Sequence, residues 1–215
     1  MTLPRQWKGN WPKGRLMTEK KRPAVFLDRD GTINEQMGYI NHLSRFHLLP
    51  GAGEAIRLLN RHRIPVVVAT NQSGLARGYF PESLLGEIHR RMRELLQEEG
   101  AFIDGLYVCP HHPEASREKY RLDCSCRKPK TGLLTRAAAD MNLDLARSFL
   151  VGDRWSDIRC AVAAGCTPVL VLTGYGRGDY TYIGPSQDIQ PEYVAENLPE
   201  AVKWIIAALE NRDES

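Results

Sequence analysis

Two aspartates, Asp28 and Asp30, directly follow an apolar run and are themselves followed by Gly-Thr. Alternate residues of an extended chain face the same side, so both carboxylates would point beyond the end of the predicted strand. Neighbouring carboxylates repel each other unless a cation lies between them or one of them is protonated. The pair therefore suits a hard divalent ion such as Mg²⁺, or a nucleophile beside a general acid. A solvated capping turn is the simpler alternative.

A second group of polar residues ends the apolar, β-branched run over residues 64–70. The run finishes at Thr70 and continues as Asn71, Gln72, Ser73 and Gly74. A hydroxyl at a strand end, beside free loop N–H groups, can bind a phosphoryl oxygen. Taken alone, the same residues also suit an ordinary turn.

A third apolar run, residues 148–152, ends in Asp153, and Asp157 follows at a spacing that shares one helical face. Arg127 and Lys128 precede a helical segment, and Lys128 offers a compact charge for a phosphate. A helix cap and a solvated basic turn are the respective alternatives. Ligands of an open α/β sheet bind outside the carboxyl ends of the strands, so these groups are expected to converge in one crevice.

Three cysteines and one histidine have the spacing of a structural zinc site: Cys109, His111, Cys124 and Cys126. His112 is an alternative ligand to His111. Four protein ligands leave no open position, so this zinc would be structural, and it would pin the loop over residues 109–126 so that Arg127 and Lys128 reach the crevice. Cys160 and Cys166 fit as small apolar residues.

The alternation of apolar runs and helical segments predicts a single α/β domain with a doubly wound parallel sheet. Helices are expected at about 51–62, 81–99, 131–141, 155–164 and 197–210, with further strands at 105–109 and 168–173. The connections are too short for a large cap domain. The 34–47 loop, the 109–126 loop and the loop over residues 174–178 would then control access to the crevice.

The four motifs, in this order over residues 24–173, resemble the haloacid-dehalogenase-like phosphohydrolases. The resemblance implies that Asp28 attacks phosphorus and forms an aspartyl-phosphate, while Asp30 acts as general acid and base. It assigns phosphoryl oxygens to Thr70 and Lys128. It implies Mg²⁺ held by Asp28, the backbone carbonyl of Asp30 and Asp153, with Asp157 behind them.

Within that superfamily, the zinc insert resembles the heptose 1,7-bisphosphate 7-phosphatases and the histidinol-phosphate phosphatases. The continuation Ser-Gly-Leu-Ala-Arg-Gly after Gln72, and Cys-Pro-His-His-Pro at 109–113, favour the heptose enzymes. That likeness implies substrate contacts by Gly38, Tyr39, Thr70, Asn71, Gln72, Ser73, Arg127, Lys128 and Arg154. Arg77 is a further candidate for steering an anion, and Gln36 and Met37 depart from the heptose pattern. The alternatives are a histidinol-phosphate phosphatase and a silent zinc module that binds a phosphosugar or a protein.

The charge of +3 is unevenly distributed: residues 1–22 carry +6 and the remainder −3. We expect a disordered basic tail over 1–22 and one phosphatase domain over 23–212, including the zinc loop. The body lacks a basic stripe, a secretory signal and a long apolar span. These features predict a cytoplasmic, monomeric enzyme with a small phosphosugar substrate and no nucleic-acid or membrane partner.

Overall fold

The computed structural model describes residues 21–213. The predicted disorder of residues 1–20 lies outside this range. Arg22, which the sequence places in the tail, already belongs to the folded part: its N–H donates to the Asn142 carbonyl at 3.4 Å and its carbonyl accepts the Asp144 N–H at 2.8 Å. No helix of the described range is long and apolar enough to cross a membrane.

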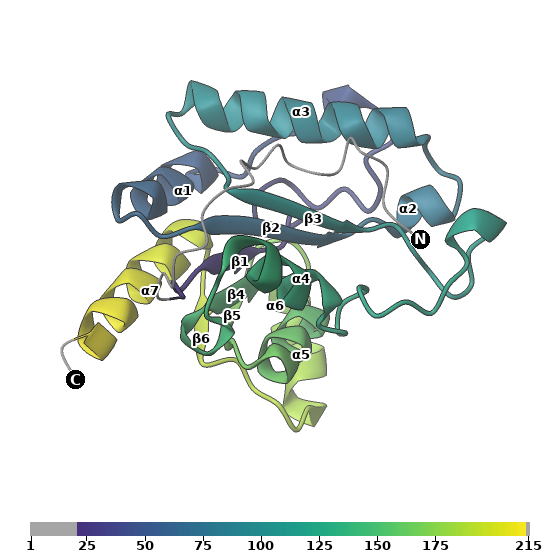
Figure 1. The fold of residues 1–215 in the computed structure, drawn as a ribbon. Helices are drawn as coiled ribbons and strands as arrows, with labels where there is room; N and C mark the ends of the chain where they lie inside the picture. The colour runs from purple at the N-terminus through teal and green to yellow at the C-terminus, as the bar shows by residue number, and fades with distance from the viewer. Residues whose placement is uncertain (1–20, 214–215) are drawn as a thin grey trace.

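Six parallel strands form one sheet in the order β3-β2-β1-β4-β5-β6 (Figure 1). The strands are β1 (Val25–Leu27), β2 (Val66–Asn71), β3 (Gly105–Cys109), β4 (Phe149–Gly152), β5 (Thr167–Val171) and β6 (Tyr193–Ala195). The parallel doubly wound sheet confirms the predicted fold class. The order of the strands reverses between β1 and β4, and ligands of such sheets bind at this point. Strand β6 was not predicted, because its three residues are flanked by Glu192 and Glu196 and form no longer apolar run.

Helices cover both faces of the sheet (Figure 1). One face packs against α1 (Ala52–Arg61), α3 (Glu82–Glu98) and α7 (Leu198–Asp213), and the other against α4 (Gly132–Met141) and α5 (Trp155–Ala164). The side chains of β1 alternate accordingly: Val25 and Leu27 enter the first core, and Phe26 the second. Strands buried on both faces explain the continuous apolar runs of the sequence.

Shorter helical segments lie in the connections between the strands and the main helices. They are η2 (Leu43–Arg45), α2 (Ser73–Ala76), η3 (Glu118–Tyr120), η4 (Leu145–Arg147), α6 (Gly176–Gly178), the π-helical η5 (Asp179–Ile183) and η6 (Gly184–Ser186). The expectation of a loop over residues 174–178 was therefore wrong for its second half. Gly176 lies so close to the carbonyl of Val171 that a β-carbon could not fit, which lets the chain turn into α6 immediately after β5.

Candidate active site

The predicted acidic residues meet at the point where the strand order reverses. Asp28 follows β1 and Asp153 follows β4, the two central strands. Carboxylate oxygens of Asp28, Asp153 and Asp157 all lie within 4.8 Å of one another. Gly31, at φ +82°, comes so close to the Asp153 carboxylate that a β-carbon would collide with it. The backbone thus closes around Asp153, which is fully buried.

The Asp153 carboxylate has one satisfied and one unsatisfied oxygen. Its Oδ2 accepts the Tyr175 N–H at 2.8 Å, whereas its buried Oδ1 has no hydrogen-bond partner. Burial, reinforced by the charges of Asp28 and Asp157, raises the pKa of Asp153 to about 8. A buried oxygen without a partner, among three clustered carboxylates, fits a hard divalent cation.

Lys128 supplies the positive charge of the site. Its buried Nζ lies 2.9 Å from Asp28 Oδ1 and 2.6 Å from Asp157 Oδ1. Burial alone would lower the pKa of Lys128, but the carboxylates of Asp157 and Asp28 outweigh it and raise this pKa above the usual value. The Asn71 side chain accepts the Lys128 N–H and donates to the Lys128 carbonyl, both at 3.1 Å. The end of β2 therefore fixes the lysine beside Asp28.

Asp30 is held by three donors. The Arg29 Nη2 lies 2.8 Å from Oδ2 and 2.9 Å from Oδ1, the Asn34 amide donates to Oδ1 at 2.9 Å, and the Gln72 amide donates to Oδ2 at 2.8 Å. The Gln72 amide also donates to the Thr70 hydroxyl at 2.9 Å. This network fixes the orientation of the expected acid and base.

Sequence reasoning missed Arg29 and Asn34, because only the fold shows that they face Asp30. Arg29 lies between Asp28 and Asp30 in the sequence, and nothing in this short motif indicates that its side chain pairs with Asp30. It is 1% exposed, and its Nη1 lies 3.0 Å from His89 Nε2 on α3.

A pocket of about 410 Å³ opens above these groups. The candidate site residues from the sequence that line it are Asp28, Asp30, Gly38, Tyr39, Asn71, Gln72, Ser73, Arg77, Arg127, Lys128, Arg154 and Asp157. Gln36 and Tyr175 line it as well. Met37 instead packs against the hydrophobic core, while Thr70 and Asp153 are buried. The volume suits a small polar ligand.

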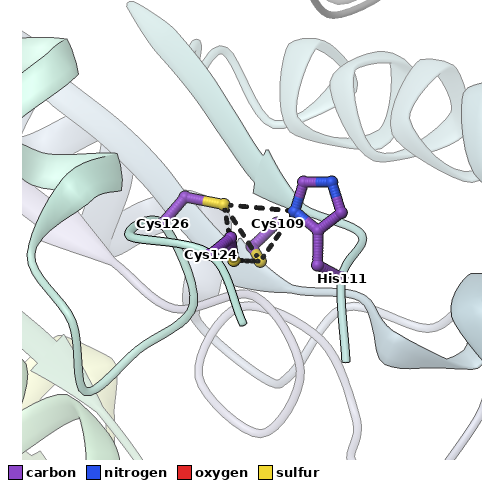
Figure 2. Close-up of side chains that lie close together, drawn as sticks. All are labelled: Cys109, His111, Cys124 and Cys126. Atoms are coloured by element: carbon purple, nitrogen blue, oxygen red, sulfur yellow. Dashed lines mark hydrogen bonds between the residues drawn. The ribbon is translucent and has the colours of Figure 1, made fainter. Parts of the chain in front are cut away.

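The Cys/His loop, residues 109–126, gathers its four predicted metal ligands at one point (Figure 2). The three sulfurs are 3.2–3.5 Å apart, and His111 Nδ1 lies 3.5 Å from the Cys126 sulfur and 3.9 Å from the Cys109 sulfur. Tetrahedral zinc with Zn–S bonds of about 2.3 Å would place sulfurs roughly 3.8 Å apart. His111 points to the sulfurs, whereas His112 lies beside Arg77.

The thiols of this loop share their protons unequally. The hydrogen bond between Cys126 and Cys109 lowers the pKa of Cys126 to about 5 and raises the pKa of Cys109. A thiolate is the form that binds a metal ion, so the group can hold a thiophilic cation.

The fold and the site match a known family of enzymes. A family model described as HAD-hydrolase-like matches residues 125–201. The D-glycero-D-manno-heptose-1,7-bisphosphate 7-phosphatase of Thermosynechococcus vestitus is 43% identical over 199 residues, which cover 89% of this chain and 99% of that protein. This chain belongs to the D-glycero-D-manno-heptose-1,7-bisphosphate 7-phosphatase family. The family member of Escherichia coli K12, named for the β anomer, is 41% identical over 88% of this chain and 91% of its own length.

Solved structures of the family agree with this placement. The D,D-heptose 1,7-bisphosphate phosphatase of B. bronchiseptica, crystallised with magnesium and phosphate, superposes with a TM-score of 0.76 at 35% identity, covering 86% of this chain and 99% of that one. A putative HAD-like phosphatase of Mesorhizobium loti gives 0.75 at 36% identity, covering 92% and 90%. Membership confirms the predicted phosphoric monoester hydrolase and supports the heptose group over the histidinol-phosphate group.

Proposed function

We propose that this protein hydrolyses the 7-phosphate of D-glycero-D-manno-heptose 1,7-bisphosphate through an aspartyl-phosphate on Asp28. The observation that carries the proposal is that Asp28, Asp30 and Lys128 line one pocket, with the buried Asp153 carboxylate within 4.8 Å of that of Asp28, in a chain whose relatives are named for this reaction. The product, a heptose 1-phosphate, would serve the synthesis of nucleotide-activated heptose.

The protein residues divide the reaction between them. Asp28 attacks phosphorus, and Lys128 offsets the repulsion between its carboxylate and the anionic phosphate. Asp30 gives a proton to the leaving oxygen and then accepts one from the attacking water. Thr70, together with loop N–H groups after β2, would bind the phosphoryl oxygens.

Two metal ions belong to the proposal. Mg²⁺, when held by Asp28, the Asp30 carbonyl and Asp153, would supply charge opposite the transferring phosphoryl oxygens. The unpartnered Asp153 oxygen and the magnesium in the B. bronchiseptica relative support this assignment. Zinc held by Cys109, His111, Cys124 and Cys126 would act structurally, since all four positions come from the protein.

Phosphate release should be measured with the α and β anomers of the heptose bisphosphate and with histidinol phosphate, in Mg²⁺. We expect a clear preference for one heptose anomer, and a preference for histidinol phosphate would refute the assignment. Asp28→Asn should abolish turnover while the circular dichroism spectrum and unfolding midpoint remain those of a folded protein. Retained turnover in that variant would exclude Asp28 as the nucleophile.

A further inference from the structure

Two arginines of the pocket lack a negatively charged partner. Arg77 and Arg127 both line the pocket, and within residues 21–213 neither forms an ion pair. The two other arginines of the pocket have acidic partners: the Arg29 Nη2 lies 2.8 Å from the Asp30 carboxylate, and the Arg154 Nε lies 3.3 Å from the Asp179 carboxylate. Uncompensated guanidinium groups in a pocket favour an anionic ligand.

Arg77 and Arg127 each contact one of two consecutive residues of the Cys/His loop, His111 and His112. The Arg127 Nη1 donates to the His111 carbonyl at 3.2 Å, and the Arg77 Nη2 lies 3.1 Å from His112 Nε2. Arg77 directly follows α2, and the carbonyl of Ala76, the last residue of that helix, accepts the Arg117 N–H of the same loop at 3.0 Å. The loop therefore fixes both guanidinium groups on one wall of the pocket.

His112 cannot satisfy Arg77 fully. Its Nδ1 lies 3.1 Å from the Glu114 N–H, so two donors face the two ring nitrogens. An imidazole ring offers at most one acceptor nitrogen, because the neutral ring carries one N–H and the protonated ring carries two. One of the two donors, Arg77 or Glu114, is consequently left without an acceptor.

One nitrogen of Arg77 is unsatisfied in either case. Its Nε is buried and has no hydrogen-bond partner among the described residues. The Nε and the neighbouring Nη2 of this planar group match the paired acceptor oxygens of a phosphate. Asp28 and Arg77 line the same pocket, so one ligand carrying two phosphates can reach both.

We propose that Arg77 binds the phosphate that is not cleaved, together with Arg127, and that His112 is a positioning residue which orients Arg77. The inference rests on the proposed bisphosphatase function. It gives the Cys/His loop a role in substrate choice, because the loop carries the partners of both arginines. Arg77 would exchange its incomplete contact with His112 for charge-assisted hydrogen bonds to the phosphate.

The test compares kcat/KM for heptose 1,7-bisphosphate with kcat/KM for the heptose 7-phosphate that lacks the second phosphate. In Arg77→Gln, the kcat/KM for the bisphosphate divided by that for the monophosphate should fall about tenfold or more, mainly through a higher KM for the bisphosphate. Arg90→Gln is the matched control, because Arg90 is 68% exposed on α3 and does not line the pocket. The control should keep the wild-type ratio.

The outcomes separate this inference from the function on which it rests. A wild-type preference for the bisphosphate that persists in Arg77→Gln would overturn the role of Arg77. A wild-type enzyme with no activity on the bisphosphate would overturn the proposed function, and the inference with it.

Substitution of His112 separates positioning from loop stability. His112→Asn keeps an acceptor oxygen and should retain most of the bisphosphate preference, whereas His112→Leu should lose it, with zinc content and unfolding midpoint the same in both variants. Equal preference in the Asn and Leu variants would refute the positioning role. Loss of zinc in both would show that His112 belongs to the metal site instead.

Discussion

Lys128→Met tests whether one buried lysine holds the acidic residues of the site together. Its Nζ lies 2.9 Å from Asp28 and 2.6 Å from Asp157, and the three side chains are at most 13% exposed. At an effective dielectric constant near 20, charges 2.6 Å apart attract each other by roughly 6 kcal/mol before desolvation is subtracted. Removing one partner of such a buried pair costs about 3–5 kcal/mol, a large part of a typical unfolding free energy of about 5–15 kcal/mol.

Urea unfolding without added Mg²⁺ measures this cost. Four proteins are compared: wild type, Lys128→Met, Asp157→Asn and the double variant. The double variant should be more stable than the sum of the single losses predicts, because removing the lysine leaves buried carboxylates unpaired and the second substitution neutralises one of them.

The control is Lys130→Met, two residues away. Lys130 pairs with Asp123 at the surface, where both side chains are about half exposed or more, and its loss should cost about 1 kcal/mol at most. If the Lys128 and Asp157 effects add within about 0.5 kcal/mol, the buried pair does not stabilise the site and the reasoning is wrong. Turnover by Lys128→Met should also fall by roughly a hundredfold or more, since a donor to the phosphoryl group is lost.

Three further predictions concern the metal sites and pH. Cys124→Ser should lower zinc content, measured by elemental analysis, and lower the unfolding midpoint, whereas Cys166→Ala, outside the cluster, should keep the zinc; unchanged zinc in the first variant would contradict the site. Withdrawal of Mg²⁺ should stop turnover without unfolding the protein, and a parallel loss of circular dichroism signal would argue against a purely catalytic role. Burial, then Arg29 and Arg93, hold the pKa of His89 well below its usual value, so the unfolded chain takes up a proton below about pH 6.5 that the folded protein does not. Stability should therefore fall as pH drops below about 6.5, by up to about 1.4 kcal/mol per pH unit, and His89→Gln, which keeps an acceptor for Arg29, should show a shallower slope; equal slopes would exclude His89 as the cause.

The strands, the main helices and the order of the acidic motifs were predictable from the sequence. Apolar runs such as residues 64–70 end in polar residues, and parallel strands place their carboxyl ends at one edge of the sheet. The spacing of Cys109, His111, Cys124 and Cys126 likewise indicated one metal site, and the fold brings these side chains together. Strand β6 and helix α6 escaped prediction because each is three residues long and neither lies in a longer apolar or periodic run.

The tertiary structure decided how each charge is partnered. The pattern of the sequence does not show that Arg29 pairs with Asp30, that Lys128 pairs with both Asp28 and Asp157, or that Arg77 contacts His112. Local sequence determines which backbone conformations and which buried faces are favourable, because these depend on neighbouring residues. Charged residues that pair with each other can be many residues apart in the sequence. Which of them pair depends on which loops the packed sheet brings within a few ångströms, so only the folded chain determines the pairs.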